Sequence, residues 1–142
     1  MSVGQILKTK GQRVVTVKSS AKISEVVATL SEERIGAVVV SDDGARVAGI
    51  VAERDLIRGL ASHGTKLLDM NAGELMTGFS PAKADMSLLH ILELMTQGRF
   101  RHMPVLEDGR LTGLVSIGDA VKARLDILES EAAHLKDYIA GR

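Results

Sequence analysis

The residues best placed to do chemistry in this sequence are Ser116 and Asp119, which lie at the predicted start of a helix. A helix N-terminus leaves backbone N–H groups unpaired and carries partial positive charge, so a phosphate can bind there. The same Ser-x-x-Asp spacing also fits a helix cap that needs no ligand. Taken alone the pattern favours capping, whereas its place in a longer repeated pattern favours a ligand site.

Catalytic chemistry is not indicated. The chain has no cysteine, and Ser116 has no nearby His-and-carboxylate pattern that would activate it. Paired metal carboxylates on one strand or helix and a Walker-type lysine are also missing. The sequence therefore disfavours an enzyme such as a small nucleotide hydrolase. No two histidines have the spacing of metal ligands, so we expect no metal site.

The second half of the sequence repeats the first. Arg34-Ile35 aligns with Arg99-Phe100, and after a one-residue deletion the segment 49–55 aligns with 113–119. A tandem repeat is one unit used twice that cannot bury its apolar face alone. We therefore expect two halves that share one interface.

Each repeat shows the same order of periodicities. Short β-branched or continuous apolar runs predict strands, and apolar residues three and four apart predict helices. The predicted unit is strand, helix, strand, strand, helix, with an Asp-Gly turn between the paired strands and a short lead-in helix before the unit. The predicted strands are 14–17, 37–40 and 47–51 in the first repeat and 79–82, 103–106 and 111–115 in the second.

This order predicts an α/β (α+β) fold of two pseudo-symmetric repeats packed sheet to sheet. We place the first repeat at residues 1–66, the second at 67–128 and a C-terminal helical extension at 129–142. The last helix is predicted to start near Asp119. Its later part carries an apolar side interrupted over 129–133, and amphipathic helices pack against whatever is nearest. A partner subunit and the flank of the chain itself both remain possible occupants.

Composition narrows the classes of partner. The 142 residues include 18 Lys plus Arg and 18 Asp plus Glu, so the formal net charge is zero. Without a net positive field and with only 2% aromatic residues, binding to nucleic acid or anionic lipid is disfavoured. No apolar run approaches the roughly 20 residues of a membrane-spanning helix, and the first residues lack a secretory signal. We expect a cytoplasmic protein.

Two copies of this unit, each with a Gly-apolar-apolar-x-x-x-Asp pattern entering the last helix, resemble the tandem cystathionine-β-synthase (CBS) domain pair, or Bateman module. The resemblance spans nearly the whole chain, and segments 99–105 and 113–119 are similar to those of stand-alone CBS pairs. It implies a regulatory module that binds an adenine nucleotide, AMP or ATP, in a cleft between the repeats and changes shape on binding.

The resemblance also implies residue roles. Asp119 would hold the ribose hydroxyls and Ser116 the phosphate side, while Met103 and Pro104 would wall the adenine and offer backbone groups. Ser80 would complete the base pocket. Arg101 or His102 could neutralise phosphate charge, although His102 could equally be a solvated strand-edge residue. The full set expected to contact the nucleotide is Ser116, Ile117, Gly118, Asp119, Arg101, His102, Met103, Pro104, Ser80, Arg54, Asp55 and Thr16.

The first repeat departs from the family pattern. Ala52 stands where a Ser or Thr is expected, and the strand entry 35–39 lacks the proline. Asp55 is retained and Arg54 precedes it. The first repeat therefore holds a weaker site or supplies only Arg54 to a phosphate bound by the second, and we place the better site in the second repeat.

Two alternatives keep the same fold. An NAD or NADH sensor would use the adenosine half of that ligand for the same Asp119 and Ser116 contacts, whereas a structural dimerisation module would have vestigial pockets. The resemblance also implies a homodimer, because CBS pairs commonly associate through their helix faces. The protein target of such a module is not evident from the sequence.

Overall fold

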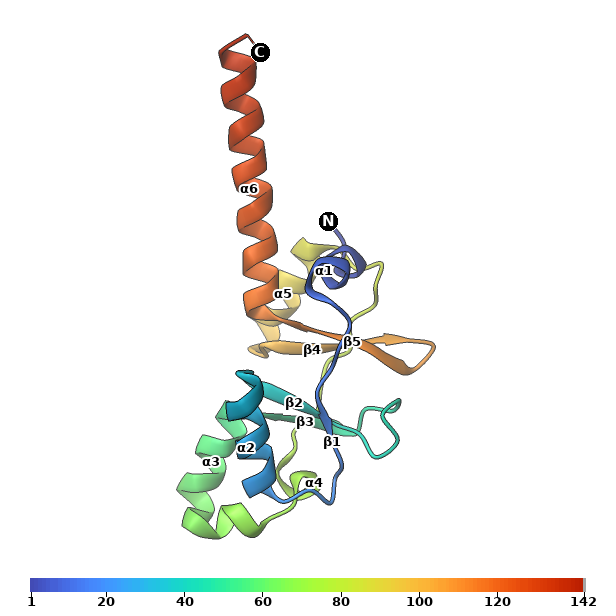
Figure 1. The fold of residues 1–142 in the computed structure, drawn as a ribbon, viewed down its shortest axis with the longest axis vertical. Helices are drawn as coiled ribbons and strands as arrows, with labels where there is room; N and C mark the ends of the chain where they lie inside the picture. The colour runs from blue at the N-terminus through green and yellow to red at the C-terminus, as the bar shows by residue number, and fades with distance from the viewer. Residues whose placement is uncertain (142) are drawn as a thin grey trace.

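The structure, a computed structural model, describes residues 1–141 and has the predicted mixed α+β architecture with two sheets (Figure 1). The first repeat comprises β1 (Thr16–Val17), α2 (Ile23–Glu33), β2 (Ala37–Val40), β3 (Gly49–Ala52) and α3 (Glu53–His63). The second comprises α5 (Leu88–Gly98), β4 (His102–Glu107), β5 (Arg110–Ser116) and α6 (Ile117–Ile139). The lead-in helices are α1 (Val3–Lys10) and α4 (Ala72–Leu75), the latter preceded by the 3-10 helix η1 (Gly64–Asp69).

The sheets of the two repeats differ in one strand. In the first, β1 runs parallel to β2 and β2 antiparallel to β3, whereas the second contains only the antiparallel pair β4 and β5. The strand predicted over 79–82 is wrong in extent, since it is reduced to a single parallel bridge between Ala82 and Val105. Pro104 is the reason for this loss, because it has no N–H to donate to the neighbouring strand.

The repeats exchange their lead-in helices. Val3, Ile6 and Leu7 of α1 pack in the core of the second repeat, whereas Ala72 of α4 packs in the core of the first. Glycines at equivalent positions make these contacts possible: a Cβ on Gly113 would lie 2.6 Å from Leu7, and one on Gly49 would lie 2.9 Å from Met76. Each core is therefore completed by the helix that precedes the other repeat, which explains why neither repeat can bury its apolar face alone.

The last helix, α6, runs without a break from Ile117 to Ile139. It crosses the predicted boundary between residues 128 and 129 and extends well beyond the rest of the molecule (Figure 1). No helix within residues 1–141 has both the length and the hydropathy needed to cross a membrane.

Candidate functional site

The start of α6 forms a complete capping box. The Asp119 N–H donates to Ser116 Oγ at 3.1 Å, and the Ser116 N–H donates to Asp119 Oδ2 at 2.8 Å. The capping interpretation of this motif is therefore confirmed, and it is compatible with ligand binding. Ser116 accepts in this bond, so its hydroxyl proton can still be donated, for example to a phosphate oxygen.

Lys10, at the end of α1, joins this cap. Its Nζ lies 2.5 Å from Asp119 Oδ2 and 2.7 Å from the carbonyl oxygen of Leu114. Both hydrogen bonds to the Asp119 side chain end on Oδ2, so Oδ1 is left to accept from ligand hydroxyls. The sequence gives no signal for Lys10, because 109 residues separate it from Asp119 and no local spacing links the two.

The contacts around Asp119 favour its charged form. Partial burial acts to raise the pKa of this carboxyl, and the hydrogen bonds from Lys10 and Ser116 act to lower it. The pKa lies below the ordinary value of an aspartate. Asp119 is therefore an ionised acceptor at neutral pH, as a residue that binds a pair of ribose hydroxyls should be.

Three further predicted residues lie at the same helix start. The Ile117 N–H donates to the Arg101 carbonyl oxygen at 2.8 Å, which ties the first turn of α6 to the segment before β4. The N–H of Gly118 is the first-turn donor that neither this bond nor the capping box uses. Ile117, Gly118 and Arg101 are all exposed, so the backbone of Gly118 and the guanidinium of Arg101 are accessible to an anion.

Pro104 leaves a backbone acceptor free on the adjoining segment. In the first repeat the Val39 N–H donates to the Val15 carbonyl oxygen at 3.2 Å. The equivalent bond in the second repeat would run from residue 104 to the carbonyl oxygen of Ser80, and proline cannot donate it. The half-buried Ser80 therefore keeps a carbonyl that can accept from an exocyclic amino group such as that of adenine.

The side chain of Met103, expected beside the adenine, is fully buried in the core of the second repeat. Its place in the nucleotide site stays a prediction. Pro104 is also buried, and its carbonyl oxygen accepts from the Ala82 N–H at 2.8 Å.

His102 lies at the contact between the repeats. A Cβ built on Gly36 would lie 3.7 Å from His102 Cε1 and 3.1 Å from Glu53 Oε1, so the imidazole and this carboxylate flank the same glycine. Burial lowers the pKa of His102, and Lys10 and Arg101 lower it further against the opposing effects of Asp119 and Glu53. The imidazole is therefore neutral at pH 7, which favours a hydrogen-bonding role over charge neutralisation.

The first repeat presents a different helix start. Ala52 has no side-chain acceptor, and Asp55 is only 6% exposed. Its Oδ2 accepts from the Ala52 N–H at 2.8 Å and from the Thr77 hydroxyl at 3.5 Å. Arg54 points to the other repeat, where it donates to the Arg99 carbonyl oxygen at 2.7 Å. The exposed Thr16 lies on β1, in the sheet of the first repeat.

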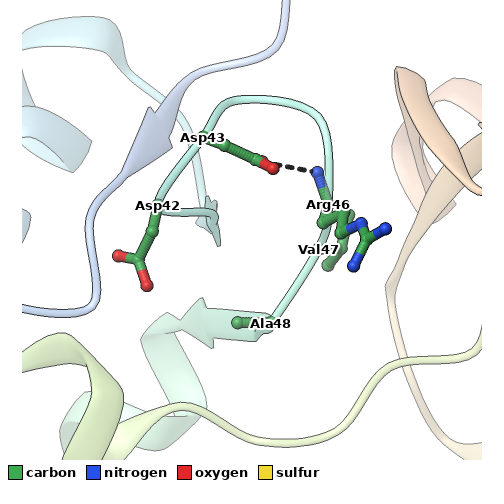
Figure 2. Close-up of a pocket in the computed structure, with 5 residues that line it drawn as sticks. All are labelled: Asp42, Asp43, Arg46, Val47 and Ala48. Carbon is green, nitrogen blue, oxygen red and sulfur yellow. Dashed lines mark hydrogen bonds between the residues drawn. The ribbon is translucent and has the colours of Figure 1, made fainter.

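A hollow of about 200 Å³ lies away from this helix start, in the loop between β2 and β3, and is lined by Asp42, Asp43, Arg46, Val47 and Ala48 (Figure 2). Asp43 Oδ1 accepts there from the backbone N–H groups of Ala45 and Arg46, both at 2.8 Å. These bonds stabilise the turn between the two strands, as Asp side chains commonly do. Residues 1–141 contain no cluster of three or more His, Asp or Glu side chains that could hold a metal ion.

Two sheets related by a repeat, exchanged lead-in helices and a capped Ser-x-x-Asp helix start define a tandem pair of equivalent domains. The family model of the CBS domain matches residues 3–62 and 72–126. The chain therefore belongs to the CBS domain family and contains two CBS domains, as its sequence indicated.

Similar proteins share this organisation. A mitochondrial CBS domain-containing protein of Arabidopsis thaliana is 29% identical over 149 residues, covering 99% of this chain and 72% of that protein. The solved structure of a CBS-domain-containing protein from Agrobacterium tumefaciens is 44% identical, with a TM-score of 0.84 over 87% of this chain and 99% of that one. A CBS domain protein from Pyrobaculum aerophilum, solved in complex with AMP, is 26% identical, with a TM-score of 0.74 over 84% of this chain and 89% of that one.

Proposed function

We propose that this chain is a non-catalytic regulatory module that binds an adenine nucleotide of the AMP or ATP class at the second CBS domain. The observation that carries the proposal is the start of α6, where Ser116, Asp119 and Lys10 converge through hydrogen bonds of 2.5 to 3.1 Å. A related protein is known in complex with AMP, which supports this class of ligand.

In this proposal each part of the nucleotide has a chemically matched partner. Asp119 Oδ1 accepts from the ribose hydroxyls, and the Ser116 hydroxyl and the Gly118 N–H donate to the phosphate. Lys10, Arg101 and Arg54 supply positive charge, of which Arg54 comes from the first repeat. The Ser80 carbonyl oxygen accepts from the adenine amino group. Occupancy would shift the relative orientation of the repeats through differential affinity for two states, and so alter contact with a protein target.

The Arg54 hydrogen bond is a contact through which nucleotide binding could change the orientation of the two repeats. Arg54 lies in the first turn of α3 in the first repeat, and its guanidinium binds the carbonyl oxygen of Arg99 at the C-terminal end of α5 in the second. A phosphate bound near the start of α6 would compete with this neutral acceptor for the guanidinium, because a charged acceptor makes the stronger hydrogen bond. Transfer of Arg54 from Arg99 to phosphate would move α3 relative to the second repeat.

Isothermal titration with AMP, ADP, ATP, NAD and NADH tests the proposal. Saturable binding of a nucleotide that is lost in Asp119→Ala, with circular dichroism unchanged, is the expected result. A preference for NAD or NADH would move the assignment to the redox-sensor alternative on the same fold. Folded protein that binds none of these ligands would leave a structural dimerisation module, and steady nucleotide hydrolysis abolished by Asp119→Ala would replace the sensor with an enzyme.

A homodimer is part of the proposal. Exposed large apolar side chains on helices of both repeats, including Val27 of α2, Ile57 and Leu60 of α3 and Leu89 of α5, leave helix faces that a second copy can cover. Light scattering that gives a concentration-independent mass near 15.1 kDa would contradict this part.

A further inference from the structure

The exposed side of α6 carries a second apolar pattern that the nucleotide site does not use. Its apolar positions alternate at spacings of four and three residues from the second turn of the helix to its end. They are Val121, Leu125, Leu128, Ala132, Leu135 and Ile139. This is the heptad pattern of a coiled coil, with Leu125, Ala132 and Ile139 at a positions and Val121, Leu128 and Leu135 at d positions.

This stripe does not face the body of its own subunit. The residues of α6 that pack in the core are Ala120, Ala123 and Ile127, which occupy c and f positions on the opposite side of the helix. By contrast, Leu125 is 53% exposed and Leu135 is 60% exposed. The helix therefore has two apolar sides near its start, one for its own core and one that points away from it.

Only the outward stripe continues beyond the body. All residues from 128 to 141 are exposed, and the c and f positions there are polar: Ser130, His134 and Asp137. The d and a positions remain apolar, with Leu128 43% and Ile139 76% exposed. The family match ends at residue 126, so this distal half lies outside the two matched CBS domains. An apolar stripe kept where the chain has no core of its own indicates a partner helix.

The flanking charges identify the partner as a second copy. In a parallel, in-register pair, a g residue faces the e residue of the following heptad on the other helix. Here g Arg124 faces e Glu129, and g Glu131 faces e Lys136. Both pairs join opposite charges, and the two-fold axis repeats each of them on the other side of the pair.

We propose that residues 121–139 form a parallel, in-register two-stranded coiled coil with the same segment of a second copy of this chain. The paired segment is about 27 Å long at roughly 1.5 Å per residue. Such a short coiled coil is marginal alone, and it is supported here because each helix grows from a folded CBS pair. It aligns the two modules side by side, with their α6 helices pointing in one direction.

Cysteine crosslinking tests the geometry directly, because the natural chain has no cysteine. In a parallel in-register pair, identical a positions near both ends of the segment face each other. We therefore expect Leu125→Cys and Ile139→Cys, made singly in the full chain, each to form a disulfide dimer in most molecules under mild oxidation. Ser130→Cys, at an exposed f position, is the matched control and should crosslink several-fold less.

Each other outcome overturns the proposal. Crosslinking at neither position shows that a different molecule covers the stripe or that nothing does. Crosslinking at only one of the two positions, or equally well at Ser130→Cys, excludes the parallel in-register pair. All three positions are exposed, so these substitutions leave the fold intact, and circular dichroism verifies this.

A charge swap tests the pairing independently of nucleotide binding. In the Ile139→Cys background, Glu131→Lys places two lysines together and should slow crosslinking roughly tenfold, since both symmetric pairs change from attraction to repulsion. Adding Lys136→Glu restores opposite charges and should restore the rate. A double variant as slow as the single one would contradict the pairing, while AMP titration of the same proteins reports the nucleotide site separately.

Discussion

The starts of α3 and α6 are equivalent positions of one repeat, and they have different chemistry. Asp119 is half-buried and accepts on Oδ2 from Lys10 and Ser116, whereas Asp55 is buried and accepts on Oδ2 from Ala52 and Thr77. The lead-in helix decides this difference, because it brings a lysine to one aspartate and its counterpart segment brings a threonine to the other. Both aspartates cap their own helix, and we expect only the more accessible Asp119 to accept from a ligand as well.

The first prediction separates these two roles and has the largest expected effect. Asp119→Ala should weaken AMP binding about 10- to 100-fold, since a charged hydrogen-bond acceptor is worth about 1.5–3 kcal/mol. Asp55→Ala should change AMP affinity less than about threefold and lower the free energy of unfolding by about 1–3 kcal/mol, because it leaves the Ala52 N–H without its acceptor. Titration of both variants measures the AMP affinity, and urea unfolding measures the free energy of unfolding. Equal losses of affinity would show that the repeats share the site.

The second prediction concerns Lys10, the cation that contacts Asp119 and has no counterpart at Asp55. Lys10→Met should weaken AMP binding about tenfold, because it removes one charge-assisted contact to phosphate. Binding of adenosine, which has no phosphate, should be unchanged or tighter, since Lys10 no longer occupies Asp119. Titration with both ligands gives the ratio of AMP to adenosine affinity for the variant and for the natural chain. If adenosine binding falls as much as AMP binding, Lys10 positions Asp119 and does not touch phosphate.

The third prediction gives β4 of the second repeat the backbone N–H that the equivalent strand of the first repeat, β2, has. Pro104→Val provides the N–H that Val39 has, and the Ser80 carbonyl oxygen becomes its acceptor. We expect AMP affinity to fall by about tenfold, the equivalent of roughly 1.4 kcal/mol for one ligand hydrogen bond, without loss of thermal stability. Binding of IMP, which lacks the exocyclic amino group, should not change. Equal loss for AMP and IMP would locate the effect outside the adenine edge.

The fourth prediction exchanges the helix caps. Ser116→Ala should lower stability by about 1 kcal/mol, and Ala52→Ser should raise it by about 0.5–1 kcal/mol, because serine supplies an acceptor for the N–H three residues on. For a chain of this size each kcal/mol moves the melting temperature by about 3–4 °C, which calorimetry resolves. An Ala52→Ser variant no more stable than the natural chain would show that the Asp55 N–H is already satisfied.

The smallest predicted effect concerns pH. His102 stands where the first repeat has Ala37, and burial, Lys10 and Arg101 lower its pKa below 6.5. The folded state therefore favours neutral His102, so its contribution to stability is complete above pH 6.5 and is lost as the pH falls through the folded-state pKa. His102→Gln should flatten the stability profile between pH 7 and 5. A profile unchanged by this substitution would assign the acid response to other groups.

The elements of each repeat could be predicted from the sequence because each depends on residues that are close together in the chain. The five-element order of each repeat, the Asp-Gly turns and the Ser116–Asp119 cap follow from spacings of a few residues. The strand over 79–82 was overestimated, because its pairing depends on the backbone of Pro104 in a different strand. The full burial of Met103 does not follow from spacing either, since the face it occupies depends on the register of β4.

The unit, its duplication and the polar residues at each helix start follow from the sequence alone. Packing sets which lead-in helix completes which core, and hence that Lys10 contacts Asp119 across 109 positions while Thr77 contacts Asp55. An amphipathic pattern shows only that a helix has a face to bury. The choice of surface is made by packing, here by the glycines at 49 and 113 that admit Met76 and Leu7.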